Sequence, residues 1–239
     1  MSAVFQGRFG AAATALKTSF SHYDPARHGP RFGFDPGPTV LIYLSWAAFH
    51  LGNTAEAEAY AARAVALAEE KGHAPTMALV MTWQILYLAA KKNWTSVKQV
   101  SSSLDKLCTE KGFPQWRPLG SAFGLFADFL ENKDPAAIDG MLAAAEAFRG
   151  YWGGFLIPCF WITAAEACWI VGMFDRGREL LDAAEAFQIA HGEYLWKDEL
   201  KRVQGLFRTE EPALKVTLPR SGGARSLPGL SPPADQSKA

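Results

Sequence analysis

The sequence carries few residues of the types and spacings that perform catalysis. It has no H-E-x-x-H, G-x-S-x-G or G-x-G-x-x-G motif and no G-x-x-x-x-G-K-[ST] phosphate loop. Histidine, the usual acid, base and metal ligand at neutral pH, occurs only at scattered positions, which are His22, His28, His50, His73 and His191. We therefore expect no catalytic residues, no metal site and no cofactor, and we expect that the chain is not an enzyme.

The candidate binding residues are aromatic and polar side chains on the inner side of the expected helices. Glu166 lies within an otherwise apolar helix. Because a lone buried carboxylate is costly, we expect Glu166 to face a groove or to pair with a neighbouring helix. Tryptophan is enriched at binding hot spots, although most of the eight tryptophans are expected in the core. The residues that we place in a concave binding groove are Asp35, Trp46, His50, Trp83, Trp161 and Glu166.

A helical hairpin over residues 37–72 is the unit that must position these side chains. Apolar or small residues recur at i, i+3, i+4 and i+7 in both of its halves. Gly52 and Gly72 end the two helices, and Asn53 and Glu56 have the spacing of a capping box at the start of the second. A lone hairpin cannot bury both apolar stripes, so it needs neighbours of the same kind.

The hairpin repeats with a period of about forty residues. Breaks lie at Gly52, Lys92, Asn132 and Gly172, and closing turns lie at Gly72, Gly112, Gly150 and Gly192. This period is typical of a tetratricopeptide-like α-solenoid, and a non-repetitive helical bundle is the alternative. We predict an all-α protein with one helical domain, residues 1–208, that contains repeats at 37–72, 75–112, 114–150 and 154–192 and a capping helix at 194–207. A disordered tail is predicted over residues 209–239, which are rich in proline, serine and glycine.

The N-terminal residues 4–20 are expected to form a second helix that lacks its first-helix partner. Its apolar face, Val4, Phe5, Phe9, Ala12, Ala13 and Leu16, would then be covered by no residue of the chain. Exposed patches of this kind mark interfaces, so we expect self-association through this end or a frayed helix. Either the chain starts in mid-repeat, as a fragment or remnant of a longer protein, or the early register is a coincidence.

Composition argues against several classes of partner. Lys plus Arg and Asp plus Glu both number 24, so no positive excess predicts binding to nucleic acid or to an anionic membrane. Three cysteines without C-x-x-C spacing indicate free thiols in a reducing compartment. Residues 154–173 have the length of a membrane span, but Pro158 and Glu166 within them favour a buried helix. Since no signal peptide is seen at Met1, we expect a cytoplasmic protein.

Residues 20–208 resemble the helical-repeat C-terminal region of large bacterial regulators that join a class III adenylate/guanylate cyclase, or another output domain, to a P-loop ATPase-like module. The matching segments are Gly33-Phe34-Asp35-Pro36-Gly37, Leu44-Ser45-Trp46-Ala47, Leu51-Gly52, Ala64-Val65-Ala66-Leu67-Ala68, Gly72-His73, Gly112-Phe113-Pro114 with Trp116, Gly192-Glu193-Tyr194, Glu199-Leu200 and Arg202. The resemblance implies a tetratricopeptide-like fold and a role in signal transduction. The paired metal-binding aspartates of the cyclase catalytic segment have no counterpart here.

These observations favour a non-catalytic helical-repeat module for protein interaction or sensing, the tail of a cyclase-associated or transcriptional regulator, with a protein or peptide partner in the concave groove. One alternative is a part of a nucleotide cyclase whose catalytic domain lies outside this chain. Another is a small-molecule sensor with an aromatic groove.

Overall fold

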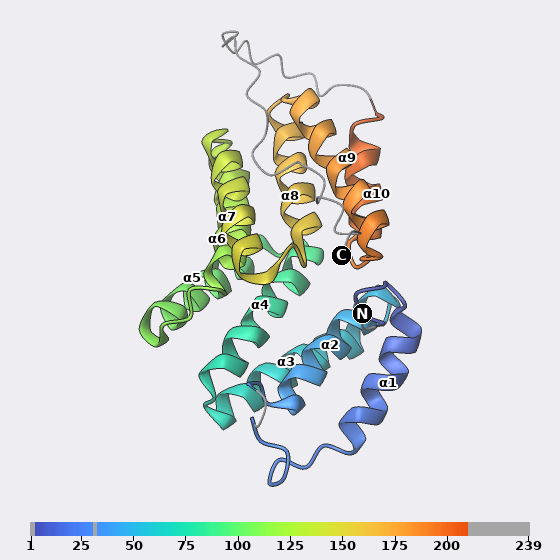
Figure 1. Cartoon of the computed structure of the whole chain (residues 1–239), viewed down its shortest axis with the longest axis vertical. Coiled ribbons are helices and arrows are strands. Elements are labelled where there is room, and N and C mark those ends of the chain that lie inside the picture. The colour runs from blue at the N-terminus through green and yellow to red at the C-terminus, as the bar shows by residue number, and fades with distance from the viewer. Residues whose placement is uncertain (1–2, 31–32, 210–239) are drawn as a thin grey trace, which may run out of the picture.

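The computed structural model describes residues 3–30 and 33–209, and over them the chain is all-helical, as predicted. The helices of this part of the chain (Figure 1) are α1 Phe9–Ser21, α2 Pro36–His50, α3 Thr54–Lys71, α4 Ala74–Ala90, α5 Trp94–Lys111, α6 Arg117–Asn132, α7 Ala136–Trp152, α8 Ile157–Ile170, α9 Phe174–His191 and α10 Lys197–Leu206. The tail predicted over residues 209–239 lies, from residue 210 onward, outside the described residues.

Successive helices pack as pairs, α2 with α3, α4 with α5, α6 with α7 and α8 with α9, and each pair packs on the next. The first helices of the pairs bury half or more of their residues, whereas the second helices bury one stripe at helical spacing. At the two ends, α1 packs on α2, and α10 packs on α8 and α9. The pairing follows the predicted hairpins, while their winding into a solenoid stays a prediction.

Left-handed glycines end the second helix of each pair. They recur about forty residues apart, at Gly72, Gly112, Gly153 and Gly192, with φ of 60, 72, 65 and 64°. The closing turn expected at Gly150 is therefore wrong, because α7 continues through Trp152. The capping box is wrong too: Asn53 makes no side-chain cap bond, and Glu56 instead pairs with Lys17 at 3.0 Å.

The N-terminal apolar face is covered by the chain itself. Residues 3–7 form a turn, and α1 begins only at Phe9, not at Val4. Val4 is buried, and the ring of Phe5 lies 4.6 Å from that of Phe155, just before α8. The prediction that no residue covers this face is wrong, because the covering residues come from far along the sequence. Self-association through this end stays a prediction, but it has lost its physical reason.

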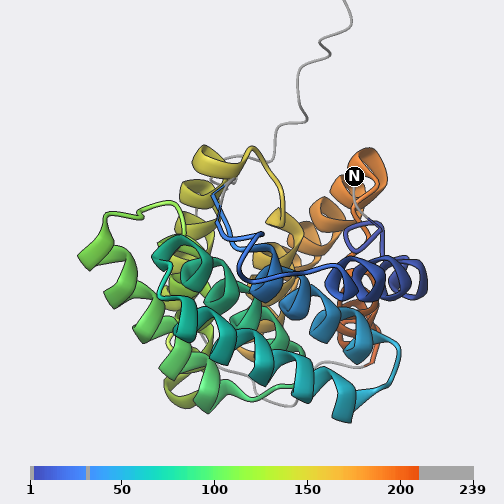
Figure 2. The ribbon, with the colours of Figure 1, turned by 90° about the horizontal axis from the view of Figure 1, so that it is seen from below.

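The first and last parts of the described chain meet. The Tyr194 N–H donates to the Phe5 carbonyl at 2.8 Å, and the ring centroids of Trp46 and Trp196 are 5.2 Å apart. The N-terminal turn accordingly lies beside the C-terminal helices in both views of the ribbon (Figures 1 and 2). These contacts place α2 beside the segment that leads into α10.

The apolar segment at residues 154–173 is mostly buried against other helices rather than exposed as a span. Within residues 3–30 and 33–209, no helix combines the length and apolarity needed to cross a membrane. Cys108, Cys159 and Cys168 are buried and make no disulfide.

Candidate functional site

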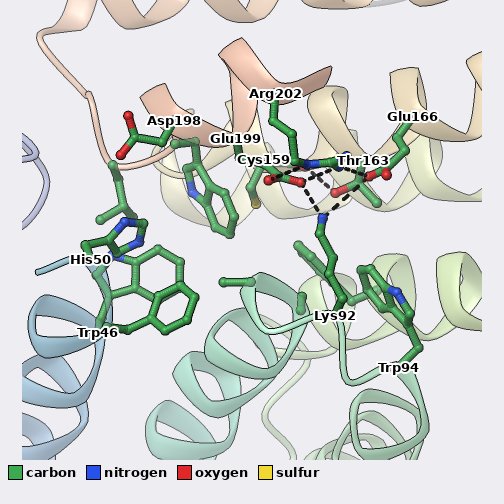
Figure 3. A pocket seen from close by; sticks show the side chains of 16 residues that line it. Trp46, His50, Lys92, Trp94, Cys159, Thr163, Glu166, Asp198, Glu199 and Arg202 are labelled. Carbon is green, nitrogen blue, oxygen red and sulfur yellow. Dashed lines mark hydrogen bonds and ion pairs between the residues drawn. The ribbon is translucent and has the colours of Figure 1, made fainter. Parts of the chain in front are cut away.

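A pocket of about 240 Å³ lies between α2, the α4–α5 turn, α6, α8 and the start of α10. Its walls come from the C-terminal half of α2, the end of α4, the start of α5, the middle of α6 and α8, and the first turns of α10 (Figure 3). The first helices of all four pairs contribute, because their inner faces converge there. One end of the pocket is ionic and the other is aromatic.

The ionic end is a cluster of four charged side chains, Lys92, Glu166, Glu199 and Arg202. Arg202 binds Glu199 with two hydrogen bonds, from Nε (2.9 Å) and Nη2 (2.8 Å), and Nη2 also reaches Glu166 Oε2 at 2.5 Å. Lys92 Nζ lies 2.6 Å from Glu199 Oε1 and 3.8 Å from Glu166 Oε2. These contacts are visible as dashed lines in Figure 3. The cluster thus joins the α4–α5 turn to α8 and α10.

Two members of this ionic cluster, Glu199 and Arg202, have shifted pKa values. Burial acts to raise the pKa of Glu199, but hydrogen bonds and charges from Arg202 and Lys92 outweigh it and lower the pKa overall. Arg202 shows the reverse balance: burial acts to lower its pKa, and Glu199 and Glu166 raise it above its ordinary value. Glu199 and Arg202 are therefore both charged at neutral pH, as their bidentate arginine–carboxylate arrangement favours.

Lys92 occupies a backbone position that suits glycine. Its φ is 59°, in the left-handed region, and the residues forty before and eighty after it, Gly52 and Gly172, have φ of 82 and 75°. A non-glycine residue in this region costs roughly 1–2 kcal/mol. Strain of this kind is found where a side chain has a function, and here the strained residue places its ammonium in the ionic cluster.

Two matched substitutions test whether Lys92 is retained for its side chain. Lys133 has the same strain (φ 55°) outside the pocket, where its Nζ donates to the Leu130 carbonyl and lies 5.6 Å from the Phe129 ring centroid. We expect Lys133→Gly to raise stability by about 0.5–1 kcal/mol, after the added entropy of the unfolded chain is subtracted. Lys92→Gly relieves the same strain but removes two ion pairs. We therefore expect its free energy of unfolding, measured in urea, to be unchanged or lower than that of the wild type. Equal gains in both variants would show that the Lys92 ion pairs contribute nothing.

The aromatic end of the pocket brings together Trp46, His50 and Trp196. The ring of Trp46 lies 4.7 Å from His50 and 5.2 Å from Trp196, at interplanar angles of 50 and 61°. Burial lowers the pKa of His50, against the opposing charges of Asp198 and Glu199, so its imidazole is neutral at pH 7. Among the described residues, Nε1 of both tryptophans and Nε2 of His50 are buried without a hydrogen-bond partner.

The structure brings three of the six proposed groove residues, Trp46, His50 and Glu166, to this pocket. Trp83 packs behind Trp46, with ring centroids 5.8 Å apart. The other two proposed residues lie elsewhere, where they have structural contacts.

Asp35 is fully buried at the start of α2, where its Oδ1 accepts from the Gly37 N–H at 2.9 Å and caps the helix. Trp161 packs against Phe187 and under the guanidinium of Arg149. Neither side chain faces the pocket.

Sequence reasoning missed four main contributors to the pocket, Lys92, Trp196, Glu199 and Arg202. A signal existed for Lys92, because it stands at a turn where the first and fourth repeats have glycine. The other three lie in or just before the last helix, and nothing in the local pattern shows that this helix returns to α2 and the α4–α5 turn.

The pocket chemistry favours binding. Cys159 lines the wall, but burial, with a smaller effect of Glu193, raises the pKa of its thiol well above the ordinary value, so it is no ready nucleophile. No group of three or more His, Cys, Asp or Glu in the described part of the chain could hold a metal ion. Comparisons with protein-family models, with curated proteins and with solved structures found no match.

Proposed function

We propose that the chain is a helical sensory module that binds a small molecule in the pocket between α2, α8 and α10. The observation that carries this proposal is the pair of buried indole N–H groups, of Trp46 and Trp196, that lack partners among the described residues beside an open cavity. A buried donor without a partner costs about 1–3 kcal/mol. A ligand that supplies an acceptor recovers this free energy on binding.

The size of the pocket favours a small metabolite over a peptide. Its volume of about 240 Å³ is below the roughly 300–1,000 Å³ of sites for drug-sized ligands. Since the first turns of α10 form one wall of the pocket, a peptide would need α10 to move. The sensory form of the proposed module is therefore favoured over the form that binds a peptide in an open groove.

The position of the pocket suggests how binding is signalled. Its walls come from both halves of the chain, so a ligand that contacts α2 and α10 together favours conformations in which these two helices are held near each other. In a larger regulator of the kind that the sequence resembles, this module is the sensory or interaction tail and the catalytic domain lies outside it. The rest of the regulator would then detect how firmly α2 and α10 are held together.

Thermal unfolding against a library of metabolites tests the proposal. Ligand at a hundred times its Kd stabilises by about 2.7 kcal/mol, which corresponds to a Tm rise of about 5–10 °C for a chain of this size. Ala90→Leu, in the pocket wall, should abolish the rise, whereas Ala62→Leu, exposed on α3, should preserve it. The proposal fails if no compound stabilises the chain, or if Ala90→Leu responds as the wild type does.

A further inference from the structure

Both cationic side chains of the pocket are already paired with carboxylates. Within the described chain, Lys92 and Arg202 both pair with Glu166 and Glu199. Asp198 also lines the pocket, is exposed and makes no ion pair with any described residue. With His50 neutral, the lining therefore has one excess negative charge. An anion would find no unpaired cation here, whereas a cation would meet an unpaired carboxylate.

The unpaired carboxylate lies at the aromatic end. Figure 3 shows Asp198 on the side of Trp46 and His50, away from the ionic cluster. Trp94 already has the Lys92 ammonium 5.7 Å from its ring centroid, and the His50 ring is stacked on Phe9 at 4.4 Å. The aromatic side chains of the pocket left for a ligand cation at this end are therefore Trp46 and Trp196. Tryptophan is the best aromatic partner for an ammonium group.

The unpartnered donors require a second chemical group on the same ligand. An indole nitrogen can donate but cannot accept, so the N–H groups of Trp46 and Trp196 need an acceptor, and in a metabolite this is an oxygen. A simple cation would leave both donors unmatched. A ligand with a cationic nitrogen and an oxygen acceptor a few bonds away matches the carboxylate, the rings and the indole donors together.

We propose that the ligand of this pocket is a small organic ammonium compound with an oxygen acceptor, such as an amino alcohol or a betaine. This inference rests on the proposed function, since it names the ligand class of the same pocket. The volume of about 240 Å³ limits the ligand to a compact molecule. The paired state of Lys92 and Arg202 argues against a carboxylic acid or phosphate that has no cationic group of its own.

Calorimetric titration with matched probes separates the two features of the ligand. Choline, ethanolamine and glycine betaine carry both features; tetramethylammonium lacks the oxygen, and 3,3-dimethyl-1-butanol is the uncharged counterpart of choline. We expect at least one of the first three to bind about tenfold more tightly than both incomplete probes. Equal or weaker binding of all three complete probes would overturn the inference.

Two variants assign the features to residues. Trp196→Phe keeps a ring but removes one donor. It should therefore reduce the ratio by which the complete probe binds more tightly than tetramethylammonium. Asp198→Asn should reduce the advantage of choline over its uncharged counterpart, and Asp182→Asn, exposed on α9, should leave it unchanged. If Asp198→Asn and Asp182→Asn behave alike, the carboxylate has no part in recognition.

The metabolite library distinguishes failure of this inference from failure of the proposed function. A hit that is an anion or a neutral compound, lost in Ala90→Leu, would overturn the ligand class and leave the sensory pocket standing. The absence of any hit would overturn both.

Discussion

Replacing Glu193 with glutamine should make the free energy of unfolding less dependent on pH. Relative to the wild type, the variant should be about 3 kcal/mol more stable at pH 8 than it is at pH 4.5. Glu193 lies between α9 and α10 and is 2% exposed. Its Oε2 accepts from the Leu156 N–H at 3.3 Å, and its Oε1 has no partner among the described residues. Burial raises the pKa of Glu193 to about 7 from an ordinary value of 4.5, although the Leu156 N–H opposes the rise.

The sign follows from the raised pKa. Between pH 4.5 and about 7 the folded chain holds a proton on Glu193 that the unfolded chain has released. The resulting stability is fully present below pH 4.5 and is lost as the pH rises through about 7, where the buried carboxylate ionises. Glutamine keeps an acceptor for Leu156 and cannot ionise, so its contribution stays constant.

Urea unfolding of both chains at several pH values between 4.5 and 8 measures this effect. Glu179→Gln, at an exposed position on α9, is the control and should follow the wild-type curve. Parallel pH curves for the wild type and Glu193→Gln would mean that the Glu193 carboxyl has the same pKa in the folded and unfolded chains.

Replacing Arg202 with methionine should lower the free energy of unfolding by about 2 kcal/mol at pH 7. Removing one partner of a buried ion pair costs about 3–5 kcal/mol, and we reduce this figure because the Arg202 and Glu166 side chains are 36% and 16% exposed. Glu166 and Glu199 would then share only Lys92. Arg178→Met removes an exposed pair with Asp175 on α9 and should cost less than about 0.5 kcal/mol.

With rising pH, the stability of the wild type relative to Arg202→Met should increase, whereas its stability relative to Glu193→Gln should decrease. The folded-state pKa of Glu199 is lowered, so its stabilisation is present above an ordinary pKa of 4.5 and is lost as the pH falls through the folded value. The difference between the wild type and Arg202→Met should therefore shrink below pH 4.5. A cost equal to that of Arg178→Met would show that the ionic cluster adds no stability.

The helices could be predicted from the sequence because their signals are local. Apolar spacing and turn glycines such as Gly72 and Gly112 act over a few residues, and the structure has those glycines in left-handed turns. Where a local signal was ambiguous the prediction failed: Gly150 lies inside α7, and the turn falls at Gly153. The predicted start of the first helix, at Val4, was wrong for a similar reason, since Val4 and Phe5 are apolar but belong to a turn.

The pocket could not be assembled from the sequence because its key contacts are long-range. Lys92 and Glu199 are 107 positions apart, and no period of forty residues predicts that the last helix returns to the second hairpin. Trp46, His50 and Glu166 were found because they depart from the expected pattern of their own helices. Arg202 fits an ordinary surface helix, where an i, i+3 pair with Glu199 is common.

The proton resonances of the tryptophan indoles provide the most direct test of the ligand pocket. Indole N–H signals of ¹⁵N-labelled chain, assigned with Trp46→Phe, Trp196→Phe and Trp161→Phe, should be recorded while choline or a library hit is added. Because the ligand oxygen accepts from the two unpartnered donors, we expect the Trp46 and Trp196 signals to shift downfield in a saturable way while the Trp161 signal stays fixed. Titrations that leave the Trp46 and Trp196 signals unmoved, or that move all indoles alike, would contradict a ligand in this pocket.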